Sequence, residues 1–430
     1  MLRGLPLACW KYRTKFPRCR VCHKRNRRDT PAGGSFRFLP VAIDSPRFDS
    51  MSAQLSLKKK LIFAAIPLLV FGGIALVGFV AISSRSLFAF AHRSGQYQDA
   101  DEISQQYFQF DENLGSRLVP DQTTPIKRSN GEVYTIHADE DGLRKAQAGE
   151  TLQEAPLILT LGCSFSFGAG VNGDETFSHL VAERLGGTSL NAAIPGHGLS
   201  QMVLQARELV PSRKPDLVLI QYSYWLVDRS TRIVIPSMFG KVPGPYFSEE
   251  GDSFTIIAPR FRSSVFDVPL RKYGQSERGP LSFAGFVCQV GFPIYGFDGF
   301  RYGSAMIATK TGLQPGPTSR KREAESWAYG EILELCRAHE AGAYVVGLGS
   351  STKPVPSMDH LGFPETRLID SNGYLVRKLS SDDQDHYAQA YYHWAGEPDR
   401  IIDTHPNAYA HSVIAESIIR VLESDDSDSR

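Results

Sequence analysis

One serine and one histidine, far apart in the chain, have the sequence neighbours that nucleophilic chemistry needs. Ser164 comes shortly after the apolar run from Leu157 to Leu161, where a buried strand is expected to turn into a helix. His405 lies in the segment Asp403-Thr-His-Pro-Asn407, about 240 residues later. A serine hydroxyl is a weak nucleophile at neutral pH, and a histidine usually takes its proton. These residues therefore indicate attack of Ser164 on an acyl carbon.

Asp403 is expected to complete a Ser–His–Asp triad by orienting the imidazole of His405 and stabilising its protonated form. A helix that begins at Ser164 would also favour negative charge developing at its N-terminus. Two alternatives remain open: Ser164 only caps that helix, which is a common role for serine, or Ser166 is the nucleophile instead. His411 lies on the expected final helix and is interpreted as structural.

The first of these segments resembles the nucleophile block of the SGNH or GDSL-type hydrolase superfamily, which contains esterases, lipases and carbohydrate O-acyl-modifying enzymes. Members usually carry Gly-Asp-Ser there, often followed by Phe-Thr-Phe-Gly, whereas this chain has Gly162-Cys-Ser-Phe-Ser-Phe-Gly168. The resemblance spans roughly residues 105 to 423 and implies that Ser164 is the nucleophile. Cys163 replaces the aspartate of the motif and is interpreted as a small buried residue.

The last block of the resemblance contains His405 and departs from the commonest pattern. Members usually carry Asp-x-x-His, but Ile402 occupies the position of that aspartate here. The acid lies two residues before the histidine, as in the Asp-x-His-Pro-Asn of many relatives. The resemblance therefore implies the triad Ser164, Asp403 and His405.

Three donors would form the oxyanion hole if the resemblance holds: the backbone amide of Ser164, a glycine and an asparagine. Asn191-Ala-Ala-Ile-Pro-Gly196 resembles the second block and places Gly196 in the glycine position. The third block differs, because Trp225 stands where the asparagine is expected. An indole N–H can donate a hydrogen bond, so Trp225 is a candidate third donor. Without any replacement, loss of one such donor costs about 2.7–4 kcal/mol of transition-state stabilisation.

Short apolar runs alternate with amphipathic ones from Pro156 onward, which predicts a parallel sheet covered by helices. With the resemblance, this indicates a three-layer, flavodoxin-like α/β fold of the SGNH hydrolase type. The expected strands are 157–161, 189–192, 216–222 and 343–348, and the expected helices are 175–185, 199–209, 320–341 and 408–422. The domain would cover residues 151–425, after a stalk and preamble at 83–150 in which Arg144 is interpreted as part of a surface hairpin. An insertion at 229–319, rich in Pro, Gly and aromatic residues, is expected to form a lid or cap.

A membrane anchor is predicted before the domain. Residues 1–60 hold fifteen Lys or Arg against three Asp, a net charge of +12, and residues 61–82 are uncharged. Those 22 residues would form a helix of about 33 Å, enough to cross a bilayer core. Lys58, Lys59 and Lys60 directly before them place the N-terminus in the cytoplasm by the positive-inside rule. The prediction is a single-pass protein of the bacterial inner membrane whose domain faces the periplasm or the outside.

Two alternatives apply to the N-terminal part. The apolar stretch can instead be the core of a cleaved signal peptide, with Ala81, Ser83 and Ser84 supplying the small residues of a cleavage site. Residues 1–50 can be an over-extended translation start, because Met51 begins a more natural lead into the anchor. Within them, Cys19-x-x-Cys22 has half of a zinc-ligand spacing, but no second pair follows.

These observations lead to one expected function and one alternative. The chain would be a membrane-anchored serine esterase or O-acyltransferase for acyl esters, with acetyl the expected acyl group and an exported or envelope polysaccharide as the substrate class. The alternative is a catalytically weak or inactive binding or assembly component of a surface-polysaccharide system, suggested by the altered first and third blocks. We expect no cofactor and no metal, and the overall net charge of +1 argues against a nucleic-acid partner.

Overall fold

The computed structural model describes residues 63, 65–74, 107–128, 131–148, 155–237, 240–258, 309–313, 315–395 and 400–428. Within the predicted span, residue 63 and residues 65–74 are helical. No helix in this part of the chain is both long enough and apolar enough to cross a membrane. The rest of that span, the basic segment 1–60 and the Cys19-x-x-Cys22 pair lie outside the described residues.

A mixed sheet of eight strands forms the centre of the fold, in the order β14-β13-β8-β6-β7-β5-β4-β3. Its strands are β3 (Thr123–Lys127), β4 (Val133–Ala138), β5 (Arg144–Lys145), β6 (Leu157–Leu161), β7 (Thr188–Asn191), β8 (Leu217–Tyr222), β13 (Gly342–Gly347) and β14 (Leu368–Ile369). The strands from β14 to β7 are parallel. Numbered in chain order, they lie as 2-1-3-4-5, a doubly wound arrangement in which ligands bind beyond the carboxyl ends of the strands.

Three antiparallel strands, β5, β4 and β3, extend this sheet beyond β7. They come from residues 123–145, within the segment that the sequence placed ahead of the domain. Arg144 in β5 pairs with Asn191 in β7, so the preamble covers the backbone groups that β7 would otherwise leave unpaired at an edge. The preamble is therefore part of the same sheet as the predicted nucleophile strand.

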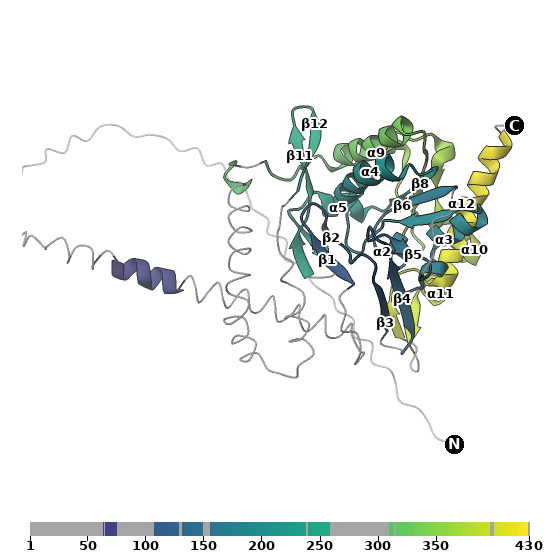
Figure 1. The fold of residues 1–430 in the computed structure, drawn as a ribbon, viewed down its shortest axis with the longest axis horizontal. Coiled ribbons are helices and arrows are strands. Elements are labelled where there is room, and N and C mark those ends of the chain that lie inside the picture. Colours follow the sequence, from purple (N-terminus) through teal and green to yellow (C-terminus); the bar gives the residue numbers. More distant parts are fainter. Residues whose placement is uncertain are drawn as a thin grey trace, which may run out of the picture. The chain divides into compact units, whose positions relative to one another are not determined.

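Helices cover both faces of the sheet (Figure 1). They are α2 (Ser164–Phe167), α3 (Phe177–Arg184), α4 (Leu199–Arg213), α5 (Trp225–Ser230), α9 (Lys321–Ala338), α10 (Ser371–Leu379), α11 (Gln384–Tyr391) and α12 (Ala408–Asp428). Short 3-10 turns occur at Gly173–Glu175, Asp359–Leu361 and Glu365–Arg367. α4 and α9 pack on one face, and α3, α10, α11 and α12 pack on the other.

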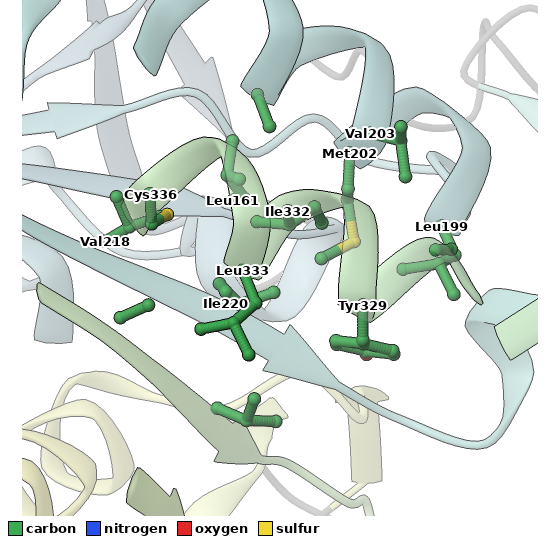
Figure 2. Close-up of a cluster of buried hydrophobic side chains, with 14 of the residues drawn as sticks. Leu161, Leu199, Met202, Val203, Val218, Ile220, Tyr329, Ile332, Leu333 and Cys336 are labelled. Carbon is green, nitrogen blue, oxygen red and sulfur yellow. The ribbon is translucent and has the colours of Figure 1, made fainter. Parts of the chain in front are cut away.

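Alternating side chains of the apolar strands hold these layers together. In β6, Leu159 and Leu161 belong to one cluster with Met202 of α4 and Ile332 of α9. Figure 2 shows Leu161, Met202 and Ile332 in this cluster. Ile158, which directly precedes Leu159 and whose side chain points to the other face, belongs to the opposite cluster. Because each such side chain contributes about 1.5–3 kcal/mol when fully buried, a strand buried on both faces is strongly fixed in register. The end of β6, where Ser164 begins the next element, is therefore a rigid point of the fold.

Four separate hairpins complete the described structure. They are β1 (Phe108–Asp111) with β2 (Gly115–Leu118), β9 (Val234–Ser237) with β10 (Gly240–Pro243), β11 (Tyr246–Glu250) with β12 (Ser253–Ile257), and β15 (His393–Ala395) with β16 (Arg400–Asp403). Two of them lie in the predicted 229–319 insertion, whose residues 259–308 fall outside the described residues. The lid or cap expected there stays a prediction.

Candidate active site

Ser164 is the first residue of α2, three residues after the end of β6. Cys163 before it is in extended conformation, and Ser164 itself is 8% exposed. α2 lasts one turn because Gly168 ends it in the left-handed conformation, at φ 78°. The hydroxyl therefore lies at the carboxyl end of a central strand, beside backbone N–H groups that a first helical turn leaves unpaired.

The structure brings Ser164, His405 and Asp403 together. His405 Nε2 lies 2.8 Å from Ser164 Oγ, and His405 Nδ1 lies 2.5 Å from Asp403 Oδ1. The backbone N–H of His405 also donates to Asp403 Oδ1, at 3.1 Å. An ionised carboxylate can only accept, so Nδ1 carries the proton and the Nε2 lone pair faces the serine hydroxyl. This is the arrangement that a general base needs in order to activate a serine.

Asp403 is held in its ionised form by its neighbours. Its partial burial acts to raise the pKa of the carboxyl, but hydrogen bonds and charge from His405, with the positive charge of Arg128, outweigh this effect and lower the pKa. The carboxylate is therefore available at neutral pH to stabilise an imidazolium on His405.

Gln221, the fifth residue of β8, fastens the turn that carries the nucleophile. Its Oε1 accepts hydrogen bonds from the Cys163 backbone N–H and the Ser166 hydroxyl, both at 2.9 Å. Its Nε2 donates to Ser223 Oγ at 2.9 Å and approaches Cys163 Sγ at 3.2 Å. A Cβ at Gly162 would lie only 2.6 Å from Oε1, so a glycine is needed where the turn passes this amide.

Arg144 fastens the other end of the same turn. It is 2% exposed, in contrast to the surface position expected from the sequence. Its guanidinium lies 4.5 Å from the centre of the Phe167 ring and donates to the carbonyls of Phe167, Gly168 and Val171. Burial lowers the pKa of Arg144 to about 10, which leaves it charged at neutral pH. Arg144 thus satisfies the carbonyls at the C-terminal end of α2.

The His405 loop is fastened from α11 and α12. Asn407 donates through Nδ2 to the carbonyls of Ala390 and Tyr392, at 2.9 and 3.0 Å. Its Oδ1 accepts from the Ala410 backbone N–H at 2.9 Å, as the side chain of an N-capping residue does. The His-Pro-Asn sequence therefore fixes the base between a hairpin and a helix.

Ser166 and His411 have structural partners. Ser166 is fully buried and donates to Gln221. His411 is fully buried on α12, stacks on Phe177 and accepts that residue's backbone N–H through Nδ1 at 3.2 Å. In the part of the chain that is described, neither competes with Ser164 and His405.

The two remaining oxyanion candidates lie around the same turn. Gly196 has φ 87°, and the loop before it is tied to the nucleophile turn by a hydrogen bond from Ile194 N–H to the Gly162 carbonyl, at 3.3 Å. Trp225 packs edge-on against Phe165, which in turn packs edge-on against His405. The Trp225 indole N–H is buried and lies next to the Cys163 thiol, whose pKa it helps to lower. The oxyanion roles of Ser164, Gly196 and Trp225 stay predictions.

Cys163 and Cys336 are buried free thiols. Burial acts to raise the pKa of Cys163, but the charge of Arg229 and hydrogen bonds that include the one from Gln221 lower it overall. Among the described residues, no cluster of three or more His, Cys, Asp or Glu side chains could hold a metal ion.

Gln221 and Arg144 are the positioning residues that the sequence did not identify. The sequence held a signal for Gln221, which is a single amide inside the otherwise apolar run 217–222. A buried polar side chain needs hydrogen-bond partners, so an amide there indicates a structural contact. Arg144 follows Gly142-Leu143 in a segment that was interpreted as surface. Its burial depends on β5 joining the sheet, and a strand of two residues leaves no recognisable pattern in the sequence.

Comparisons with known proteins found matches among solved structures only. Neither a family model nor a curated protein matches the sequence. Thirty chains of solved structures match, and GDSL-type lipolytic hydrolases and esterases are among them. An acetylxylan esterase from Geobacillus stearothermophilus, solved as a catalytic mutant, is 13% identical, covering 63% of this chain and 96% of its own, with a TM-score of 0.30. An alpha/beta hydrolase from the Lake Arreo metagenome is 16% identical, covering 62% and 94%, with a TM-score of 0.32.

Proposed function

We propose that this chain is a serine-dependent esterase or O-acyltransferase of the SGNH type that forms a covalent acyl-Ser164 intermediate. The observation that carries the proposal is the contact of 2.8 Å between His405 Nε2 and Ser164 Oγ, with Asp403 on the opposite side of the imidazole. These two side chains are 241 residues apart in sequence. Ser164 begins the helix that follows a core strand, and His405 lies in a loop near the C-terminal end.

The first half of the reaction transfers the acyl group to the serine. His405 Nε2 takes the Ser164 proton as Oγ bonds to the acyl carbon, and the carbonyl oxygen becomes an oxyanion. The amides of Ser164 and Gly196 and the Trp225 indole would stabilise that oxyanion. When the tetrahedral intermediate collapses, the bond to the leaving alkoxide breaks and His405 returns the proton to it. The products of this half are an alcohol and acyl-Ser164.

The second half decides between hydrolysis and transfer. A water molecule or an acceptor hydroxyl loses its proton to His405 and attacks the acyl carbon, and Ser164 leaves and regains that proton. Water gives a free acid, whereas a hydroxyl gives a new ester. We take acetyl as the acyl group and a polysaccharide as the substrate class, because the sequence resembles carbohydrate O-acyl-modifying enzymes and predicts an exported domain.

The first test uses the full-length chain with p-nitrophenyl acetate and a fluorophosphonate probe, which reacts with activated serines. Native protein should be labelled and turn over the ester. Ser164→Ala and His405→Ala should each lower kcat by roughly 10³-fold or more and abolish labelling. Ser166→Ala, a buried serine two residues away, is the matched control and should still be labelled. Absence of labelling in native protein would favour the alternative, a binding component without activity.

The second test concerns the predicted placement of the domain outside the cytoplasm, anchored by residues 61–82. Alkaline phosphatase is active only after export, so a fusion after Gln96 should be active and a fusion before Leu57 inactive. The reverse pattern would place the triad in the cytoplasm and remove the argument for an exported polysaccharide.

A further inference from the structure

A buried arginine from the preamble lies behind the catalytic acid. Arg128 follows β3 at the turn into β4, where its backbone N–H donates to the Glu132 carbonyl at 2.7 Å. Its side chain is 7% exposed, and Nη2 lies 3.7 Å from Asp403 Oδ2. The guanidinium also lies 5.6 Å from the centre of the Tyr134 ring, on β4. Asp403 is thus contacted on one side by His405 and on the other by a cation from the β3–β4 turn.

The energetics of burial explain why this contact matters. Arg128 Nε and Nη1 are buried and have no hydrogen-bond partner within the described ranges. A buried guanidinium is strongly unfavourable unless an anion compensates it. The carboxylate that the structure places against Arg128 is Asp403, whose Oδ1 is occupied by His405 while Oδ2 faces the arginine. The two oxygens of the acid are therefore divided between the base and the cation.

The backbone beside this pair leaves space for the arginine head. Gly170 has φ 94°, and a Cβ there would lie 1.4 Å from Arg128 Nη2 and 3.1 Å from His393 Nε2. The guanidinium packs directly on this glycine. An alanine at position 170 would thus displace the cation without altering Arg128 itself.

We propose that Arg128 is a positioning residue that acts through Asp403, so that the functional unit is Ser164–His405–Asp403–Arg128. The proposal rests on the esterase or acyltransferase function above and deepens it. It assigns a role in the active site to the preamble, because the β3–β4 turn supplies the cation. Arg128 fixes the orientation of Asp403 and keeps it an anion as His405 gains and loses its proton.

Among the residues that the structure describes, the titratable and charged groups that face Asp403 are Arg128, Tyr134, His393 and His405. The positive charge of Arg128 favours loss of protons from its neighbours, and it contributes to the lowered pKa of Asp403. Burial first, and then Arg128, lower the pKa of His393 to about 4. Without this cation, the Asp403–His405 pair should bind a proton more readily. The acid limb of the pH–rate profile should therefore move to higher pH.

The experiment compares native full-length protein with Arg128→Gln, Arg128→Lys and Gly170→Ala, each with urea unfolding to verify the fold. With p-nitrophenyl acetate, Arg128→Gln should lower kcat/KM at pH 7 about tenfold and move the half-maximal point of the acid limb up by about one pH unit. Arg128→Lys should keep the limb near its native position, and Gly170→Ala should move it in the same direction as Arg128→Gln. A lowered rate with an unmoved limb in Arg128→Gln would overturn the proposal.

A second readout does not depend on turnover. NMR of ¹³C-labelled histidine would follow protonation of the His405 ring in native protein and in Arg128→Gln, with His393→Gln in both to remove that neighbour's signal. The ring should take up its proton at a higher pH in the arginine variant, and equal midpoints would refute the inference. Absence of ester turnover in native protein, by contrast, would refute only the proposed function.

Discussion

The two halves of the Ser164–His405 pair are held by different kinds of structure. Ser164 begins a short helix at the end of a strand buried on both faces, and Gln221 and Arg144 fasten both ends of its turn. His405 lies between a two-stranded hairpin and the last helix, and Asp403 beside it is 32% exposed. The proposed nucleophile is thus part of the core, whereas the proposed base is attached to the periphery. Changes on the nucleophile side should reduce both stability and activity, whereas a change of His405 itself should mainly reduce activity.

The largest expected effect is on the base side. Asp403→Asn should lower kcat/KM for an aryl acetate by roughly 10³–10⁴-fold, because an amide cannot stabilise the imidazolium and can favour the wrong tautomer. The free energy of unfolding should also fall, by about 2–4 kcal/mol, because the substitution leaves the buried Arg128 guanidinium without its anion, although the carboxylate itself is partly exposed. Steady-state kinetics and urea unfolding measure the two quantities. A loss of less than tenfold in kcat/KM would mean that Asp403 is not the acid of the triad.

The next effect is on the nucleophile side. Gln221→Leu should lower the free energy of unfolding by about 2–4 kcal/mol, because it leaves the Cys163 N–H and the Ser166 hydroxyl buried without partners. It should also lower kcat, since the turn that carries Ser164 loses its attachment to β8. Urea unfolding and turnover of the same aryl acetate test both parts.

Asn372→Leu is the matched control for this prediction. Asn372 is a fully buried amide on α10 that donates to the Ser351 and Lys353 carbonyls and accepts from the Tyr387 hydroxyl. Its loss should cost a similar amount of stability and leave kcat unchanged. Equal effects of the two substitutions on kcat would contradict the local role of Gln221.

The smallest expected effect concerns His411, six residues after His405, and is a change in how stability depends on pH. Burial, followed by repulsion from Arg144, lowers the pKa of His411 to about 3, so the folded state keeps this ring neutral. Below about pH 6.5 the unfolded chain binds a proton that the folded chain does not, and stability falls by up to about 1.4 kcal/mol per pH unit. His411→Gln should flatten the dependence of unfolding free energy on pH between 4.5 and 6.5. An unchanged slope would exclude His411 as its source.

Much of the parallel core could be predicted from sequence, because its strands are continuous apolar runs. The expected strand 157–161 coincides with β6, and the expected helix from residue 199 begins where α4 begins. Ser164 and His405 could be identified because their chemistry is distinctive and their flanking residues resemble a known pattern. The structure places both at the same end of the sheet, within hydrogen-bond distance.

The contribution of the preamble could not be predicted, for a physical reason. β5 has two residues, and its partner in β7 is set by tertiary packing rather than by local propensity. Arg128 and Arg144 look like ordinary surface cations in the sequence, since arginine is rarely buried without a partner. Their partners, a carboxylate and three carbonyls, come from segments up to 275 residues away, as Arg128 and Asp403 are.

The pairing of β5 with β7 has a practical consequence for anyone who shortens this polypeptide. A fragment beginning at Pro156 would keep the parallel strands but lose β5, so the free N–H and C=O groups of β7 would be a template for pairing with another chain. Such a fragment should self-associate and precipitate, and it would lack both Arg144, which binds the carbonyls of the Ser164 turn, and Arg128, which contacts Asp403. Any soluble version should therefore start ahead of Tyr107.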